Sequence, residues 1–226
     1  MDPNYVTSIP ESAEEHITEA YADGQKMKAE YILNGEIVGV RFFHETGEPS
    51  FEYTLQHGRL HGVQYRWDEP GILLSAEPYE DGLPHGTAKQ WSGEGKLIGA
   101  YTLVHGTGID LWWQDCGEPY LSEVHYVKDG MYHGYEWWLS ADQKKVYEER
   151  HWWQAQLHGI ERRWNRRWRL SRGYPGYYIH GQRVKKRQYI KAGKLYPELP
   201  VFREEDNRPE RVFPAEIQAH LRKEID

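Results

Sequence analysis

The residues whose types and spacing best fit a catalytic site are four carboxylates gathered around a pair of tryptophans. This acidic cluster consists of Asp110, Asp115, Glu118 and Glu123, with Trp112 and Trp113 among them. Hydrolysis of a glycoside requires two carboxyl groups about 5 to 9.5 Å apart in a cleft, one of them with a raised pKa. A hydrolase using this cluster is therefore one hypothesis. The other, which we prefer, is a solvated acidic rim beside structural tryptophans.

Twelve histidines raise the question of a metal site. Four of them precede a glycine at regular intervals, as His61-Gly62, His85-Gly86, His133-Gly134 and His158-Gly159. A residue type that recurs at one place in successive repeats serves the local backbone, so we interpret these histidines as turn residues. His105 and His180 have no histidine or carboxylate at i+2 or i+4 that could complete a metal pair. We therefore expect neither a metal nor a cofactor.

Other catalytic signatures are missing from the sequence, which contains no nucleophile elbow, phosphate-binding glycine loop or His-Glu-x-x-His motif. The single cysteine, Cys116, cannot form an internal disulfide or a thiolate metal cage.

With 38% hydrophobic and 28% charged residues, the composition is that of a soluble globular protein. The N-terminus lacks the basic and apolar regions of a signal peptide. We expect a cytoplasmic protein that is not an enzyme.

An internal repeat of 22 to 26 residues, marked by six glycines, is the clearest pattern in the chain. These slot glycines are Gly39, Gly62, Gly86, Gly108, Gly134 and Gly159. An aromatic residue precedes each of them by seven to nine residues, and a second follows by four or five. The second aromatic column comprises Phe43, Trp67, Trp91, Trp113, Trp138 and Trp164, with Tyr189 in a seventh, degenerate unit. Each unit thus holds two extended stretches joined by short glycine-containing turns, which predicts a β-hairpin.

The predicted fold is all-β, an elongated single-layer antiparallel meander of about seven repeated β-hairpins and about 14 strands. The repeats occupy residues 20–195, between an N-terminal cap at 1–19 and a C-terminal cap at 196–226. Short helices are expected in both caps, because the exposed edge strands of such a sheet need cover.

The expected cap helices have recognisable start signals. Ser12 and Glu15 form a capping box for a helix at about residues 11–18. Pro214 suits the first turn of a second helix. The apolar face of that helix would comprise Ile217, Leu221 and Ile225.

The segments at 81–86 and 129–134 both have the form Asp-Gly-x-x-His-Gly, placed between two aromatic strands. This pattern resembles the MORN-repeat family, and specifically a bacterial variant of about 23 residues found in antitoxin and immunity proteins. The resemblance covers about residues 20 to 195. It implies a twisted sheet one layer thick, used as a scaffold for partner proteins and without a conserved catalytic centre.

Adjacent tryptophans must point to opposite faces of a strand, so each such pair places one ring on each face. In a single layer, part of this aromatic surface is available to a partner. The candidate partner-binding residues are Asp110, Trp112, Trp113, Asp115, Glu118, Trp137, Trp138, Trp152 and Trp153.

Charge is distributed very unevenly along the chain. Residues 1–149 carry a net charge of -16, residues 150–194 carry +12, and residues 195–226 carry -3. The acidic part would attract a cationic protein, and toxin nucleases are often cationic because they bind phosphate backbones. The basic patch consists of Arg162, Arg163, Arg166, Arg167, Arg169 and Arg172.

The function that we expect is stoichiometric protein binding by an antitoxin or immunity-type scaffold that neutralises a cationic toxin by occluding its active site. A homodimer that pairs the basic end of one copy with the acidic end of another is a further partner hypothesis. The alternative function is a peripheral scaffold whose basic C-terminal repeats bind an anionic membrane or nucleic acid.

Overall fold

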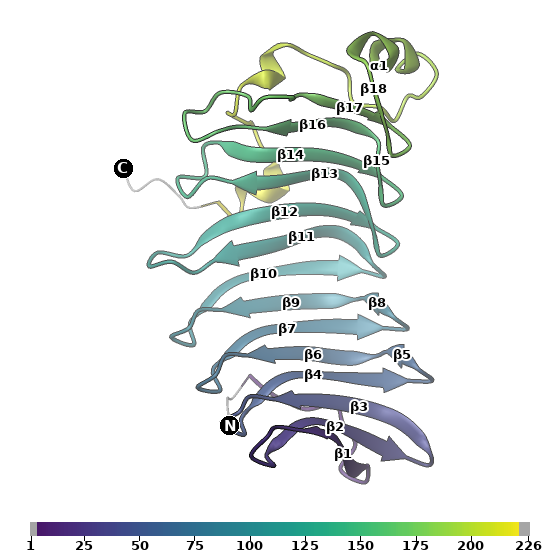
Figure 1. Cartoon of the computed structure of the whole chain (residues 1–226), viewed down its shortest axis with the longest axis vertical. Helices are drawn as coiled ribbons and strands as arrows, with labels where there is room; N and C mark the ends of the chain where they lie inside the picture. The colour runs from purple at the N-terminus through teal and green to yellow at the C-terminus, as the bar shows by residue number, and fades with distance from the viewer. Residues whose placement is uncertain (1–3, 222–226) are drawn as a thin grey trace. The chain divides into compact units, whose positions relative to one another are not determined.

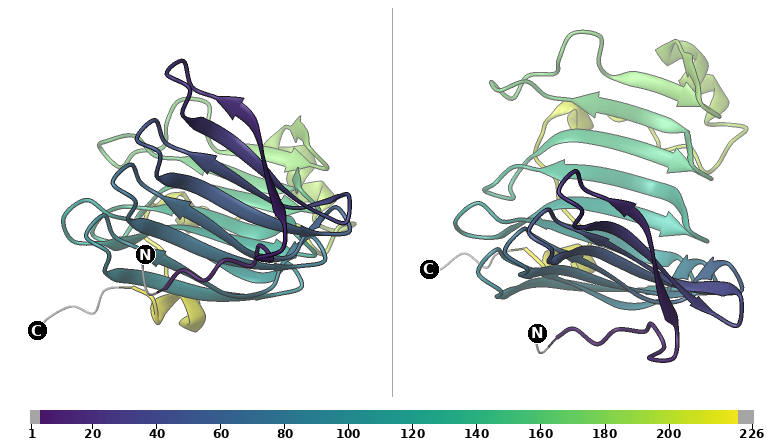
Figure 2. Two further views of the ribbon diagram at one scale, coloured as in Figure 1. Left: turned by 90° about the horizontal axis from the view of Figure 1, so that it is seen from below. Right: turned by 60° about the horizontal axis from the view of Figure 1, so that its bottom comes forward.

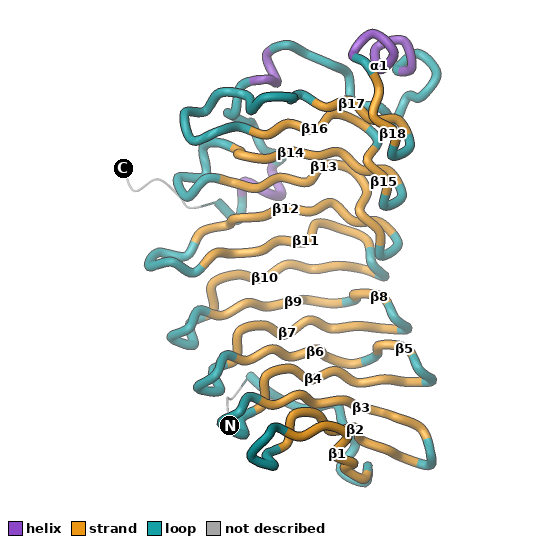
Figure 3. The backbone as a smooth tube through the Cα atoms, viewed as in Figure 1, coloured by secondary structure: helices purple, strands orange, loops and turns teal. Residues whose placement is uncertain are grey.

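The computed structural model describes residues 4–221. The chain divides into two compact units, named here unit 1 (Met1–Gly106) and unit 2 (Thr107–Asp226). Within each unit, successive strands pair antiparallel in chain order, and the loops lie at the strand ends (Figures 1 and 3). The predicted all-β antiparallel meander is confirmed.

The strands of unit 1 are β1 (Glu14–Ala20), β2 (Lys26–Leu33), β3 (Glu36–Phe43), β4 (Pro49–Gln56), β5 (Arg59–Leu60), β6 (Gly62–Trp67), β7 (Leu73–Glu80), β8 (Leu83–Pro84), β9 (Gly86–Trp91) and β10 (Leu97–Val104). The elements of unit 2 are β11 (Thr107–Gln114), β12 (Tyr120–Lys128), β13 (Met131–Leu139), β14 (Val146–Trp153), β15 (Gln156–Leu157), β16 (Gly159–Arg163), β17 (Gly176–Ile179), β18 (Gln182–Val184), α1 (Lys186–Ala192), the 3-10 helix η1 (Glu205–Asn207) and α2 (Ala215–Gln218). No helix of residues 4–221 has the length and apolar character needed to cross a membrane.

Tight turns join paired strands at residues in the left-handed backbone region. Asp81-Gly82 has φ values of +48° and +87°, and Asp129-Gly130 has φ values of +52° and +75°. Two successive residues with positive φ are characteristic of the type I′ turn, whose twist matches that of the flanking strands. The Asp-Gly pairs of the repeat therefore form the hairpin turns.

The slot glycines have a different role from the one predicted, because they belong to strands rather than to the hairpin turns. Gly62, Gly86 and Gly159 begin β6, β9 and β16, and the other three lie within β3, β11 and β13. Gly62 and Gly134 have φ values of +97° and +102°. A Cβ on Gly62 would overlap Thr54 Oγ1, and one on Gly134 would lie 3.2 Å from Tyr126 Cβ. Glycine is needed at these positions because both the conformation and the neighbouring strand exclude a side chain.

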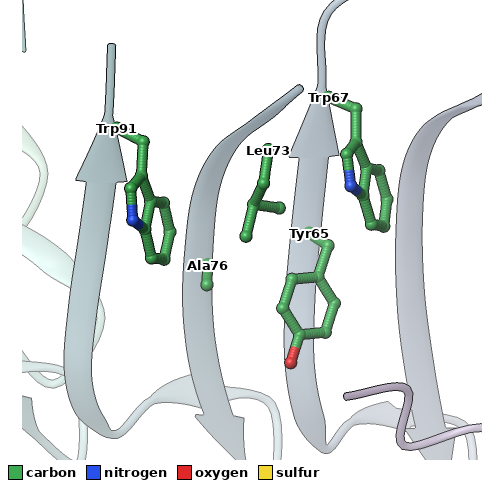
Figure 4. Close-up of a cluster of buried hydrophobic side chains, with 5 residues drawn as sticks. All are labelled: Tyr65, Trp67, Leu73, Ala76 and Trp91. Carbon is green, nitrogen blue, oxygen red and sulfur yellow. The ribbon is translucent and has the colours of Figure 1, made fainter. Parts of the chain in front are cut away.

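Four tryptophans of the second aromatic column form part of the cores. Trp67, Trp91, Trp113 and Trp164 are all at least 93% buried. In unit 1, Trp67 and Trp91 pack with Tyr65, Leu73 and Ala76 (Figure 4). Trp138 does not share this role, since the preceding residue, Trp137, is the one that faces the buried side of its strand.

The ends of the chain differ from the prediction. The segment expected to be a helix at 11–18 contains β1 instead, and this strand pairs with β2 along the edge of unit 1. Pairing with β1 satisfies the backbone N–H and C=O groups along the edge of β2. This stabilisation outweighs the local preference for a helix that the capping box indicates. Residues 4–9 then cross one face of unit 1 (Figure 2), where the Tyr5 hydroxyl donates to Glu52.

The seventh unit ends in a helix rather than a strand. Tyr189 lies in α1, where it is 98% buried and packs with Ile160, Tyr177 and Leu199. Helix α2 begins directly after Pro214, as predicted, and buries Ile217, but it ends at Gln218 and does not include Leu221. Ile225, assigned to the same helical face, lies outside the described residues.

Candidate functional site

A row of five charged side chains crosses five strands of unit 2 on one face, named here the open face. This charged row consists of Asp110, His125, Glu136, Arg150 and Glu161. Asp110 is paired with His125, His125 with Glu136, and Glu136 with Arg150. Directly opposite residues point to the same side of a sheet, so the ladder register alone brings these groups together.

His125 is the central group of this site. The residue is 95% buried. Its Nδ1 lies 3.0 Å from Glu136 Oε1, and its Nε2 lies 3.2 Å from Glu123 Oε2. Burial by itself would lower the pKa of His125, but the hydrogen bonds to these two carboxylates and the charge of Asp110 outweigh it and raise the pKa to about 9. At neutral pH the ring is an imidazolium that donates from both nitrogens.

Glu136 links His125 to the next strand. It is 97% buried, and its Oε2 accepts a hydrogen bond of 2.7 Å from Trp152 Nε1. Nη1 of Arg150 lies 3.6 Å from the same oxygen, while the Arg150 guanidinium covers the Trp138 ring at 4.8 Å. Two cations and an indole therefore surround this buried carboxylate and satisfy its oxygens.

The network continues to the last strands of the face. Arg150 also contacts Glu148 and lies 3.6 Å from Glu161. Arg163 donates to Glu148 from Nε at 2.8 Å. Around His125, Arg150 and Arg163 the open face carries five carboxylates, those of Asp110, Glu123, Glu136, Glu148 and Glu161. The five carboxylates of this network therefore outnumber its three cations.

Aromatic rings border the charged row on both sides. Trp112 and Trp138 both lie opposite Glu123, whereas Tyr132 and Trp152 pack ring to ring at 5.6 Å on the other side. These four residues are half-buried or exposed. Each offers an apolar surface beside a fixed charge.

The opposite side of unit 2, named here the covered face, carries the C-terminal segment 200–217. Phe213 packs on Trp137 with ring centroids 5.5 Å apart, and Trp164 Nε1 donates to the Asn207 carbonyl at 2.9 Å. In Figure 1 this segment, drawn in yellow, passes behind the strands of unit 2.

The predicted partner-binding residues are thus divided among several places. Trp112, Trp138, Trp152 and Asp110 lie on the open face, together with Glu123. Trp113 and Trp137 are buried on the covered side, which confirms that adjacent tryptophans face opposite ways. Trp153 packs against His133 with ring centroids 4.3 Å apart. Asp115 and Glu118 are exposed in the turn between β11 and β12.

The carboxylates of the predicted acidic cluster are therefore distributed over two strands and a turn. None of the four lines the 680 Å³ pocket of unit 2, which opens on the covered face.

The predicted basic patch also divides. Arg162 is 97% buried and bonds Glu149 on the covered face, while Arg163 bonds Glu148 on the open face. The remaining four arginines, all exposed in the segment that follows Trp164, are Arg166, Arg167, Arg169 and Arg172.

Two groups of side chains have the composition of a metal site: Glu80 with His85 and His105, and His158 with His180 and Glu198. Nδ1 of His85 accepts the backbone N–H of His105 at 3.1 Å, and Nδ1 of His158 accepts that of His180 at 3.0 Å. A neutral imidazole has one nitrogen lone pair, so the proton of each accepting ring is on Nε2, facing the carboxylate at 3.5 and 3.4 Å. This hydrogen bonding does not fit metal ligation.

In three repeats the residue before the slot glycine instead caps the next hairpin, whereas Nδ1 of His61 makes no hydrogen bond. Thr107 holds the same position before its glycine, and its Oγ1 accepts the N–H of Asp129 at 3.1 Å. His85 and His158 make the equivalent bond to the first residue of the following turn. The sequence interpretation of these histidines as turn residues is supported for both, although the turn that each one serves belongs to the following hairpin.

Sequence reasoning missed His125, Glu136, Glu148 and Arg150. No local motif marks them, since the partners that lie on neighbouring strands are 11 to 16 residues apart and meet only through strand register. No family model matches the chain, and no curated protein is similar to it in sequence.

Proposed function

We propose that this chain is a non-catalytic repeat scaffold that binds a cationic protein on the open face of unit 2. The observation that supports the proposal is the charged row with its surplus of carboxylates and its aromatic borders. Half-buried aromatic residues beside fixed charges are typical of interface residues that contribute most of the binding energy.

The network should also lower the entropic cost of binding and increase the rate of association. Glu136 and His125 are already desolvated and fixed by hydrogen bonds, so little ordering is needed on this side of an interface. The excess negative charge would accelerate encounter with a basic surface, an effect that weakens as salt is added.

The partner class that we propose is a cationic toxin, which the scaffold neutralises by covering its active site. The sequence resemblance to antitoxin-type MORN repeats supports this choice, as does the net charge of -16 over residues 1–149. Nucleases are suitable candidates because their substrate-binding surfaces are basic.

The test is affinity capture from the source cell with the wild-type chain as bait, followed by binding measurements with the purified partner. Trp138→Ala with Glu123→Gln should weaken binding at least tenfold, because both the ring and the exposed charge are lost. Leu97→Ser is the matched control, since Leu97 is an exposed residue of unit 1. A neutral or acidic partner, or equal loss in the control, would refute the proposal.

A second candidate function rests on the arginine segment after Trp164. Four exposed arginines lie within seven residues, beside Trp168, whose ring packs under Lys145 Nζ at 4.9 Å. Such a segment suits an anionic membrane or nucleic acid. Reversal of Arg166 and Arg167 to glutamate should then abolish salt-sensitive binding to anionic vesicles or to DNA. Unchanged binding would remove this candidate.

A further inference from the structure

A pocket of about 680 Å³, named here the back pocket, lies on the covered face of unit 2 beneath the C-terminal segment. The strands provide its floor through Tyr135, Trp137 and Glu149, and the segment contributes Arg203 and Arg211. Its volume falls within the range of sites that hold small organic molecules.

The buried acid of this pocket is fully neutralised by its neighbours. Glu149 is 98% buried and bonds Arg162 through Oε1, and its Oε2 accepts from Arg211 Nε at 2.8 Å and Trp137 Nε1 at 2.7 Å. Burial alone would raise the pKa of Glu149, but the two guanidinium groups and the indole hold it below its usual value. Glu149 is therefore a charged structural group that leaves no acceptor for a cationic ligand.

Positive charge remains after this pairing. Nη2 of the buried Arg162 has no hydrogen-bond partner, and its ion pair with Asp206 Oδ2 is long, at 4.0 Å. Arg203 lines the same pocket and has no ion-pair partner within residues 4–221. An unpaired buried guanidinium nitrogen is costly, so this donor is positioned for an acceptor supplied from outside the chain.

The rest of the wall is aromatic. Tyr135 and Trp137 stack with an interplanar angle of 12°, and their ring centroids are 5.0 Å apart. Tyr126 and His133 also line the pocket. We propose that the back pocket binds a small aromatic molecule that carries a carboxylate, with the carboxylate on Arg162 Nη2 and Arg203 and the ring against the aromatic wall.

The pocket of unit 1 offers a contrast. It encloses about 560 Å³ between Tyr5, Arg41 and Trp67. There the arginine is satisfied internally, because Arg41 bonds Glu52 and the hydroxyls of Tyr5 and Tyr31. Internal acceptors already occupy the donors of that arginine. Of these two pockets, therefore, the back pocket is the one with a donor in need of a ligand.

The proposal is tested by titrating the full chain with 2-naphthoate and with its neutral analogue 2-naphthamide, using calorimetry and the indole N–H signals of an NMR spectrum. We expect 2-naphthoate to bind in a 1:1 complex at least tenfold more tightly than 2-naphthamide and to shift the Trp137 signal. Arg203→Gln should abolish most of this tenfold preference without unfolding the protein, because Arg203 is exposed and makes no ion pair within the described residues.

Arg163→Gln is the matched control, since its guanidinium bonds Glu148 on the open face. Equal affinity for the acid and the amide would overturn the proposal, as would undetectable 2-naphthoate binding or an unchanged preference in Arg203→Gln.

Discussion

Replacement of His125 by glutamine should remove a pH-dependent part of the stability of unit 2. The folded-state pKa of about 9 exceeds the ordinary value of 6.5, so the folded state binds the proton more tightly than the unfolded state does. The contribution is therefore fully present below pH 6.5 and is lost as the pH rises through 9. A difference of about 2.5 pKa units corresponds to about 3 kcal/mol in the free energy of unfolding.

Urea-induced unfolding followed by tryptophan fluorescence is the appropriate assay, because eight of the ten tryptophans lie in unit 2. At pH 6 the wild type should be more stable than His125→Gln by about 3 kcal/mol, and at pH 9.5 this difference should be mostly gone. His16→Gln, which alters an exposed histidine of unit 1, should show no comparable dependence. A wild-type advantage that is the same at both pH values, or an NMR-measured pKa of His125 at or below 6.5, would refute the reasoning.

Three further substitutions probe the scaffold. Glu149→Gln should destabilise unit 2 by about 3–5 kcal/mol in urea unfolding, because it leaves two guanidinium groups without their buried counter-charge; a loss below about 1 kcal/mol would contradict this. Gly62→Ala should cost about 1–3 kcal/mol in thermal unfolding, more than Gly24→Ala, which has a similar φ of +88° but open space around it; equal costs would exclude the steric part of the argument. Thr107→Val should accelerate amide exchange at Asp129, whose N–H loses its acceptor, and unchanged exchange there would remove the capping role.

The sequence was sufficient to predict the class of fold because the same hairpin pattern recurs in successive repeats. Glycines and aromatic residues at a common spacing predict hairpins, and the structure confirms antiparallel strands with Asp-Gly turns. The helix expected at 11–18 was wrong because a capping box measures only local preference, whereas the free edge of β2 decides which conformation the segment adopts.

The candidate site was less accessible to sequence reasoning. Trp112, Trp138 and Trp152 could be named because adjacent tryptophans must face both ways. His125 and Glu136 could not, because their pairing depends on a ladder irregularity between His125 and Val127 that shifts the register. A hairpin centred on Asp129-Gly130 without that irregularity would have paired His125 with a different residue.

Binding of a cationic protein to the open face of unit 2 is what we propose for this chain. Hydrogen-exchange mass spectrometry of the chain with and without its captured partner tests this directly. We expect protection in peptides covering β12, β13 and β14, and weaker protection when salt is raised. Protection confined to unit 1, or to residues 165–172 that carry the exposed arginines, would contradict it.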